Sequence, residues 1–398
     1  MSKRPFLTKF TALALCLSSM TAFTACDKLG SIFPFMNNSS QQSTFIDATF
    51  EMTQPDRPVS LVHTAVNMYL SADPEKLVTD YLPSGEYRYD WGNPFVIEYT
   101  VSSNIGKPDV KRTKVEFSFQ ENFSKIEQTE IFKGNQSELP IYNLQTGKTY
   151  YYRVTVDLDG DHNGTTLYQV GTVTTKESPR MLRIDGASNV RDIGGWKTED
   201  GKTVKQGVLY RGGEIDGGKN TGHADFCLTV SGIQQMRALG IKTDFDLRSE
   251  SVKVSDHSIL GEDVTRHFYD AAQYQSILQP ANAAKTRKIF SDLANPAAYP
   301  AYIHCTHGVD RAGSIVLILK AFLGVSKADL IRDYELSAYY HNYKHVNRNV
   351  ETGGTILKLL EGLEAYPGET LAKKTESFLA SIGLSLSEVE TLRSIFLE

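Results

Sequence analysis

A cysteine and an arginine with five residues between them carry the strongest chemical signal in this chain. Cys305 and Arg311 enclose Thr306 to Asp310, and Gly308 lets the backbone curl between them. A short apolar run precedes this stretch and a longer one, residues 315–323, follows it, so we expect the order strand, loop, helix. Such a loop turns backbone N–H groups inward, and the helix dipole adds positive potential. The pattern therefore predicts a cradle for a phosphate dianion.

The residue types in this loop fit phosphoryl transfer. A guanidinium grips two phosphate oxygens at once, so we expect Arg311 to clamp the anion. The positive field favours the thiolate of Cys305, and a thiolate facing a phosphoryl group predicts a phosphocysteine intermediate. No metal or cofactor is needed for this chemistry. The predicted phosphate-binding residues are Thr306, His307, Gly308, Val309, Asp310 and Arg311.

Cys-x5-Arg between a strand and a helix resembles the signature of the protein tyrosine phosphatases. The run His304-Cys305-x-x-Gly308-x-Asp310-Arg311-x-Gly313 is most similar to a bacterial branch whose loop ends Lys-Asp-Arg-Thr-Gly. Three further stretches resemble the same branch in the same order, namely 189–195 (NVRDIGG), 210–214 (YRGGE) and 239–250, which contains DLRSE. The resemblance covers residues 183–398. It implies an enzyme that hydrolyses phosphomonoesters, with a phosphorylated protein or a small phosphomonoester as its substrate.

The resemblance also suggests an acid and a supporting histidine. In this branch an Asp beside the Arg has been assigned to protonate the leaving group, and Asp310 occupies that place. The alternative is that Asp310 braces Arg311 or caps the helix. Asp192 and Asp246 are fallback acids, although each also fits a structural ion pair with a nearby arginine. His304 either orients the loop or is a buried histidine with satisfied hydrogen bonds.

Two residues depart from the pattern of the branch. Val309 stands where the branch has a Lys that is associated with phosphoinositide recognition, and we expect Val309 at the rim of the loop. A lipid substrate is therefore disfavoured. Ala312 replaces a Thr whose hydroxyl is held to help the thiolate leave, and Ser314 or Thr306 can substitute for it. These departures leave an alternative of a different class, a catalytically weak receptor or adaptor that only binds phosphate.

The start of the chain resembles a bacterial lipoprotein signal. A basic beginning is followed by a short apolar stretch that ends in small residues, and Phe23-Thr24-Ala25-Cys26 resembles a lipoprotein cleavage box. Residues 1–26 are therefore predicted to be the signal with a lipidated Cys26, and an ordinary signal peptide or an uncleaved anchor is the alternative. Residues 27–44 are polar and predict a flexible tether. We expect an exported protein, periplasmic or on the cell surface, that is anchored to the membrane.

The rest of the chain predicts two domains. Residues 45–85 give a weak signal, with strand in 59–70 and a helix over 73–81. Residues 86–176 hold several alternating runs with no helix between them, which predicts an all-β sandwich that resembles a fibronectin type III module. Residues 180–398 alternate strands and helices, which predicts an α/β catalytic domain with a mostly parallel sheet and flanking helices. The net charge of -5 does not favour a nucleic-acid partner.

Overall fold

The computed structural model describes residues 48–398 except 86–87, 105, 107, 160–163, 219–225, 341–342 and 351–353. The predicted signal, the tether and Cys26 lie outside the described residues. Among the residues described, no helix is long and apolar enough to cross a membrane. The chain forms two compact units that are interleaved in sequence. Of the described residues, the first comprises 48–54, Ile97–Leu139 and Tyr150–Thr172, and the second comprises Pro55–Val96, Pro140–Thr149 and Val173–Glu398.

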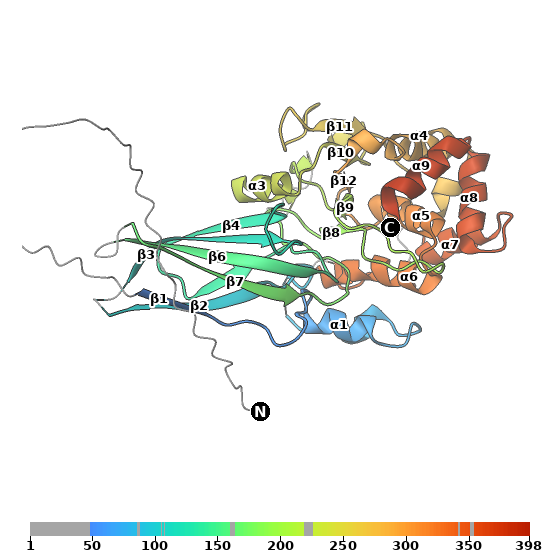
Figure 1. Ribbon diagram of the computed structural model, residues 1–398. Coiled ribbons are helices and arrows are strands. Elements are labelled where there is room, and N and C mark those ends of the chain that lie inside the picture. Colours follow the sequence, from blue (N-terminus) through green and yellow to red (C-terminus); the bar gives the residue numbers. More distant parts are fainter. Residues whose placement is uncertain are drawn as a thin grey trace, which may run out of the picture. The chain divides into compact units, whose positions relative to one another are not determined.

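The first unit is built from two antiparallel sheets (Figure 1). One has the order β1-β2-β5, with β1 at Ala48–Met52, β2 at Phe95–Ser103 and β5 at Glu138–Ile141. The other has the order β4-β3-β6-β7, with β3 at Asp109–Ser118, β4 at Gln128–Lys133, β6 at Thr149–Asp159 and β7 at Thr166–Thr174.

Strand alternation explains why these sheets pack together. In β6 every second residue is buried, as expected when one face of a strand covers a core. Between the two sheets, the Tyr99 hydroxyl of β2 lies 2.9 Å from the Thr113 hydroxyl of β3. Within the first sheet, the Phe50 and Tyr99 rings meet edge to face. An all-β region is therefore present where we predicted one. Its likeness to a fibronectin type III module stays a prediction.

The second unit contains a five-stranded sheet of order β11-β10-β12-β9-β8. Its four strands β9 to β12 run parallel and β8 is antiparallel to β9, so a mostly parallel sheet is confirmed. In register, His304 pairs with Gly212 and with Asp246, so three strands end at the same edge. The bounds are β8 Arg191–Asp192, β9 Leu209–Gly212, β10 Thr243–Asp246, β11 Thr265–Phe268 and β12 Ala301–His304.

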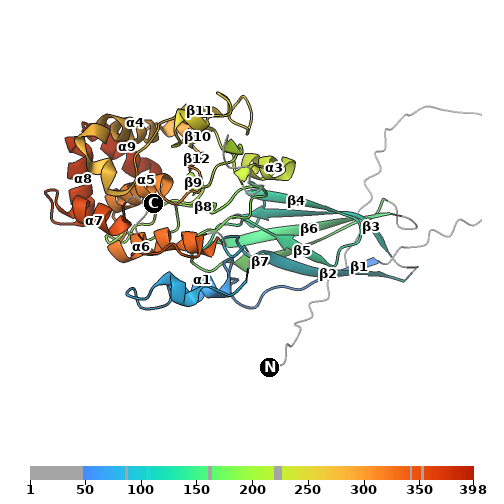
Figure 2. The ribbon, with the colours of Figure 1, turned by 180° about the vertical axis from the view of Figure 1, so that it is seen from behind.

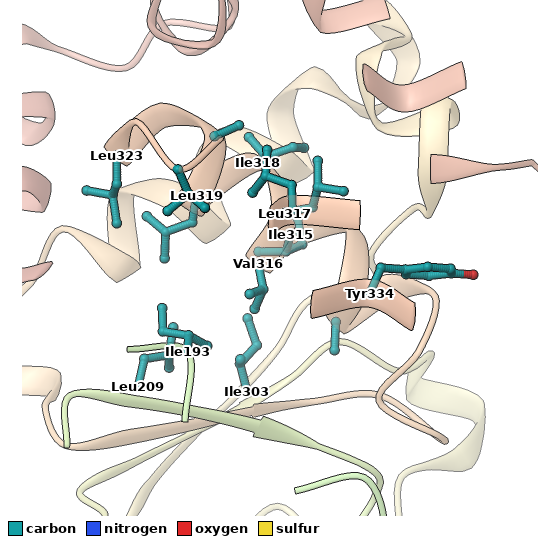
Figure 3. Packing of buried hydrophobic residues seen from close by; sticks show 14 of the residues in the cluster. Ile193, Leu209, Ile303, Ile315, Val316, Leu317, Ile318, Leu319, Leu323 and Tyr334 are labelled. Carbon is teal, nitrogen blue, oxygen red and sulfur yellow. The ribbon is translucent and has the colours of Figure 1, made fainter. Parts of the chain in front are cut away.

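Helices cover this sheet. The central helix is α5, and the side chains of all its residues except Arg311 are buried, in agreement with its continuous apolar run. Figure 3 shows its apolar side chains facing Ile193, Leu209 and Ile303 from the sheet side. The helices of residues 230–396 are α3 Val230–Ala238, α4 Ala283–Leu293, α5 Arg311–Leu323, α6 Lys327–Glu335, α7 Ile356–Glu364, α8 Leu371–Ser381 and α9 Leu386–Phe396. Single 3-10 turns join them at Glu250–Val252, Tyr274–Leu278, Pro280–Asn282, Pro296–Ala298 and Leu336–Tyr339.

The segment Pro55–Val96 is part of the second unit. The strand expected in 59–70 and the helix expected over 73–81 are wrong, because the segment forms α1 at Thr64–Leu70 and a 3-10 turn, η1, at Val78–Tyr81. His63 caps α1 by accepting a hydrogen bond from the N–H of Ala65. The apolar face of α1 joins the main core, and α1 lies beside α6 in both views (Figures 1 and 2).

Candidate active site

The predicted loop joins β12 to α5. Cys305 follows the last residue of β12 and is 2% exposed, and Arg311 is the first residue of α5. Gly308 has a φ of +72°, and a Cβ atom there would lie 2.4 Å from the backbone of Gly212. Only glycine fits this place, because both the left-handed conformation and the close approach exclude a side chain. The sharp curl of the loop thus depends on one residue.

The loop's carbonyl groups are held from outside. The carbonyl of Thr306 accepts from the N–H of Glu214 at 3.0 Å, that of His307 from the Asn189 amide at 3.2 Å, and that of Gly308 from the Arg211 guanidinium at 2.7 Å. In a trans peptide the C=O and the next N–H point in opposite directions. The N–H groups of residues 307–309 therefore point away from these donors, as a phosphate cradle requires.

The three residues that hold these carbonyls were missed as site residues. Asn189, Arg211 and Glu214 lie in stretches that resemble the phosphatase branch, but their spacing alone revealed no role. Their positions become informative only once β9 is placed beside β12. The signal that could have found them was the recurrence of polar residues in those stretches, next to expected strands.

Arg311 and the loop hydroxyls lie together. A guanidinium nitrogen of Arg311 donates to the Thr306 hydroxyl at 3.1 Å, so the arginine reaches back along the loop. The Ser314 hydroxyl donates to the carbonyl of Asp310 at 2.7 Å and accepts from the N–H of Tyr274 at 2.8 Å. Of the two hydroxyls that could replace the missing Thr, that of Thr306 is the one that contacts the arginine.

Asp310 is held by a tyrosine. The Tyr274 hydroxyl donates to its carboxylate and lies 2.9 Å from the Tyr334 hydroxyl. Tyr274 is fully buried and has a φ of 51°, an uncommon conformation for a residue with a side chain. Burial raises the pKa of Tyr334 to about 12, so its hydroxyl keeps its proton at neutral pH. Asp310 occupies the N-cap position of α5 but its side chain makes no capping hydrogen bond, so the predicted alternative of a helix cap is wrong.

His304 lies beneath the loop and is fully buried. Its Nε2 lies 2.9 Å from a carboxylate oxygen of Asp244, and its Nδ1 lies 3.3 Å from the carbonyl oxygen of Cys305. Burial disfavours the imidazolium, but Asp246 and Asp244 outweigh it and raise the pKa of His304 above its usual value. A protonated ring donates from both nitrogens. His304 can therefore donate to the carbonyl of Cys305. Glu214, Asn189 and Arg211 donate in the same way to the carbonyls of the next three residues of the loop.

The two fallback acids serve the framework. Asp246 pairs with Arg248 and Arg266, and burial is outweighed by His304 and these arginines, which hold its pKa far below the usual range. A carboxylate that keeps its charge so strongly is a poor proton donor. Asp192 accepts from Arg180 and from the N–H groups of Gly194 and Gly207, so it ties together the chain that follows β8.

Val309 does not lie at the rim of the loop. Its side chain is 2% exposed and belongs to the main apolar core, so the expected rim position is wrong. The physical reason is that the loop turns its N–H groups toward the anion and this side chain toward the core. His307 is half-buried, with its ring 5.1 Å from Phe226 and 4.9 Å from Tyr343.

Tyr343 is a further residue that the sequence did not suggest. Burial, and then the charges of Asp310 and Cys305, raise the pKa of its phenol. Those two charges come from the loop, and the ring lies 4.9 Å from that of His307, so Tyr343 lies beside the loop. Its ring also stacks on Tyr340 at 5.5 Å. Phe226, His307, Tyr340 and Tyr343 form one cluster of contacting rings, of which His307 and Tyr343 are half-buried and the other two are buried.

Comparison with known proteins agrees with this geometry. Residues 182–398 match the model of the tyrosine phosphatase family. A Cupriavidus necator protein named "Putative tyrosine-protein phosphatase" is 27% identical over 210 residues, which cover 47% of this chain and 70% of that protein. A Nostoc commune protein named "Tyrosine-protein phosphatase" is 26% identical over 138 residues, which cover 28% of this chain and 46% of that protein. The family match spans more than half of the chain, which therefore belongs to the tyrosine phosphatase family and is a phosphatase enzyme.

Proposed function

We propose that the protein hydrolyses phosphomonoesters of the phosphotyrosine type through a phosphocysteine on Cys305, without a metal. The observation that carries this proposal is the loop itself. Its carbonyls are held outward by His304, Glu214, Asn189 and Arg211, with Cys305 at its base. Fixed N–H groups stabilise charge on the phosphoryl oxygens without reorganising during the reaction.

The reaction runs in two displacements. The Cys305 thiolate attacks phosphorus, the bond from phosphorus to the ester oxygen breaks, and the leaving oxygen takes a proton from Asp310. Water then attacks the phosphocysteine and gives a proton to the Asp310 carboxylate, and the S–P bond breaks to release phosphate and restore the thiolate. The Arg311 guanidinium donates to the Thr306 hydroxyl, and in the complex with substrate it grips two phosphoryl oxygens.

The substrate class follows from the walls of the site. The half-buried rings of His307 and Tyr343 lie 4.9 Å apart beside the loop, which suits an aromatic ester better than a sugar alcohol. Val309, which stands in place of a Lys, is buried and presents no charge for the extra phosphates of an inositol lipid. We therefore expect phosphotyrosine peptides to be better substrates than phosphoinositides.

The test is hydrolysis of p-nitrophenyl phosphate by the wild type and by Cys305→Ser. The proposal requires turnover that the substitution abolishes, with both proteins showing the same thermal melting. The competing function, a receptor or adaptor that only binds phosphate, predicts tight vanadate binding by the wild type with no turnover. Turnover that survives Cys305→Ser would sink the phosphocysteine mechanism.

The role of Asp310 has its own test. Asp310→Asn keeps the shape of the side chain, so we expect a modest loss with p-nitrophenyl phosphate and a loss on the order of 10²–10⁴-fold for esters whose leaving groups need a proton. Tyr274→Phe removes the hydroxyl that holds this carboxylate and should cause a smaller loss with the same trend. The measurement is kcat/KM over a series of leaving-group pKa values. A uniform loss would mean that Asp310 serves phosphate binding and is not the acid.

We further propose an exported lipoprotein that is anchored through Cys26. The basic start, the apolar stretch and the Ala25-Cys26 junction support it. Cys26→Ser should move the protein from the membrane fraction to the soluble exported fraction. Membrane association that survives this substitution in an exported protein would contradict lipidation.

A further inference from the structure

A hydrogen-bond path enters the phosphate loop from a part of the chain that precedes the family match at residues 182–398. It begins at Asp90, which is 1% exposed and lies in the segment Pro55–Val96 of the second unit. The carboxylate of Asp90 accepts the backbone N–H of Asn189 at 2.8 Å. The Asn189 side-chain amide then donates to the carbonyl of His307.

Asp90 is itself held in place. The Arg88 guanidinium donates to both of its oxygens, at 2.9 and 3.0 Å, and also to the carbonyl of Ala187 at 2.9 Å. The same guanidinium stacks over the Trp91 and Tyr340 rings. A bidentate arginine pair of this kind fixes direction as well as position. The carboxylate therefore presents one defined oxygen to Asn189.

Asn189 needs such an anchor. Its φ is 56°, a left-handed conformation that is uncommon for residues with a side chain, although Asn adopts it more readily than most, and the bond to Asp90 fixes the backbone N–H in this conformation. Its side-chain amide makes two more hydrogen bonds, since it also donates to the Ser337 hydroxyl and accepts from the Arg191 guanidinium. A small rotation of this backbone would move the amide away from the loop.

We propose that Asp90 is a positioning residue for the phosphate loop, acting through Asn189 on the His307–Gly308 peptide. When Asn189 holds the carbonyl of His307 outward, the N–H of Gly308 points toward the anion. The segment before the family domain is thus a working part of the active site. This inference rests on the proposed function of the loop as an oxyanion cradle, and it extends the site to a residue that family comparison leaves out.

The test is a double-mutant cycle in the full chain with Asp90→Ala and Asn189→Gly. Glycine accepts the left-handed backbone, so the second change removes the amide alone. The readouts are kcat/KM for p-nitrophenyl phosphate and the dissociation constant of vanadate by calorimetry. One lost hydrogen bond predicts that Asp90→Ala lowers kcat/KM about tenfold and raises the vanadate dissociation constant about tenfold. Asn189→Gly also loses the bonds to Ser337 and Arg191, so both of its changes should be at least as large. The double variant should match Asn189→Gly within about twofold, because the two changes break the same path.

A matched control separates positioning from stability. Tyr69 lies in the same segment and donates to Glu335 away from the loop. Tyr69→Phe should lower the melting temperature while leaving both readouts within about twofold of the wild type.

The proposal would be overturned if folded Asp90→Ala had wild-type values of both readouts, or if the losses of the two single variants added in the double variant. If Asp90→Ala does not fold, Asp90→Asn replaces it in the cycle, and additive losses again overturn the inference. Vanadate binding needs no turnover, so it tests Asp90 even if the absence of Cys305-dependent hydrolysis refutes the proposed function.

Discussion

Two buried charge clusters of opposite composition flank the phosphate loop. The first, the Asp333 cluster, places one carboxylate among three cations, Arg191, Arg211 and Lys320. The second, the Asp246 cluster, places four carboxylates around two arginines and a histidine. Its members are Glu214, Asp216, Asp244, Asp246, Arg248, Arg266 and His304. One cluster has an excess of positive charge and the other has an excess of carboxylates.

Both clusters reach the loop, but with different groups. The Asp333 cluster contacts the loop through Arg211, which binds the carbonyl of Gly308. The Asp246 cluster contacts it through His304 below Cys305 and through the backbone N–H of Glu214. Positive charge beside an oxyanion site stabilises the anion directly. The Asp246 cluster has an excess of carboxylates, which repels phosphate. It can therefore support the site only by fixing the positions of His304 and Glu214, which contact the loop.

The two clusters also respond to pH in opposite directions. Burial lowers the pKa of Lys320 from the usual 10.5, Asp333 opposes this shift, and Arg211 and Arg191 add to it, so the pKa lies at about 7. In the other cluster the pKa of His304 is raised, since Asp246 and Asp244 outweigh burial. Lys320 and His304 are both buried, but their neighbouring charges differ in sign. Folding therefore favours the neutral form of Lys320 and the protonated form of His304.

The largest effect is expected from Asp333→Asn. This change leaves three buried cations without a carboxylate, and breaking such a group costs about 3–5 kcal/mol of unfolding free energy. Urea unfolding measures it. Asp263→Asn is the matched control, because its partner Arg237 and Asp263 itself are exposed and no measurable change is expected there. A loss no larger than that of the control would show that the cation-rich cluster does not depend on its carboxylate.

The contrast between the clusters marks the limit of prediction from the sequence. The loop, its Cys305 and Arg311, the buried helix that follows it and the mostly parallel sheet follow from local patterns, because glycine, apolar runs and short spacings act within a few residues.

Features that depend on distant parts of the chain could not be predicted. Asp90 and Asn189 are 99 residues apart, and no local pattern relates them. Val309 was expected at the rim but lies in the core, because the direction of a loop side chain depends on which face of the peptide points to the anion. The same holds for Asp333, whose three cations come from β8, β9 and α5.

An intermediate effect is expected from Asp244→Asn in the cluster rich in carboxylates. His304 has a raised pKa in the folded state, so its pairing contributes stability fully below about pH 6.5 and loses it as the pH rises through the raised value. Removing the charge of Asp244 should therefore cost about 1–3 kcal/mol near pH 6 and less near pH 9. Asp246 still faces the ring, which keeps the loss below that of Asp333→Asn. Urea unfolding at both pH values tests this, and an equal loss at the two would exclude a charged His304.

The smallest effect is expected from Lys320→Met, and its sign is the sharpest test of the comparison. Below about pH 7 the lysine is protonated in both states, so the folded protein carries the full cost of a buried cation. Between about 7 and 10.5 the folded protein has lost the proton while the unfolded chain keeps it. The unfolded state then binds more protons, and stability rises with pH.

Lys320→Met removes this dependence of the stability on pH. The variant should be more stable than the wild type near pH 6, and this gain should shrink by about 1.4 kcal/mol for each pH unit between about 7 and 9. His304 titrates in both proteins, so its opposite contribution cancels in the difference. A gain that stays constant with pH, or grows, would show that Lys320 keeps its proton in the folded protein and that the two clusters do not differ in this way.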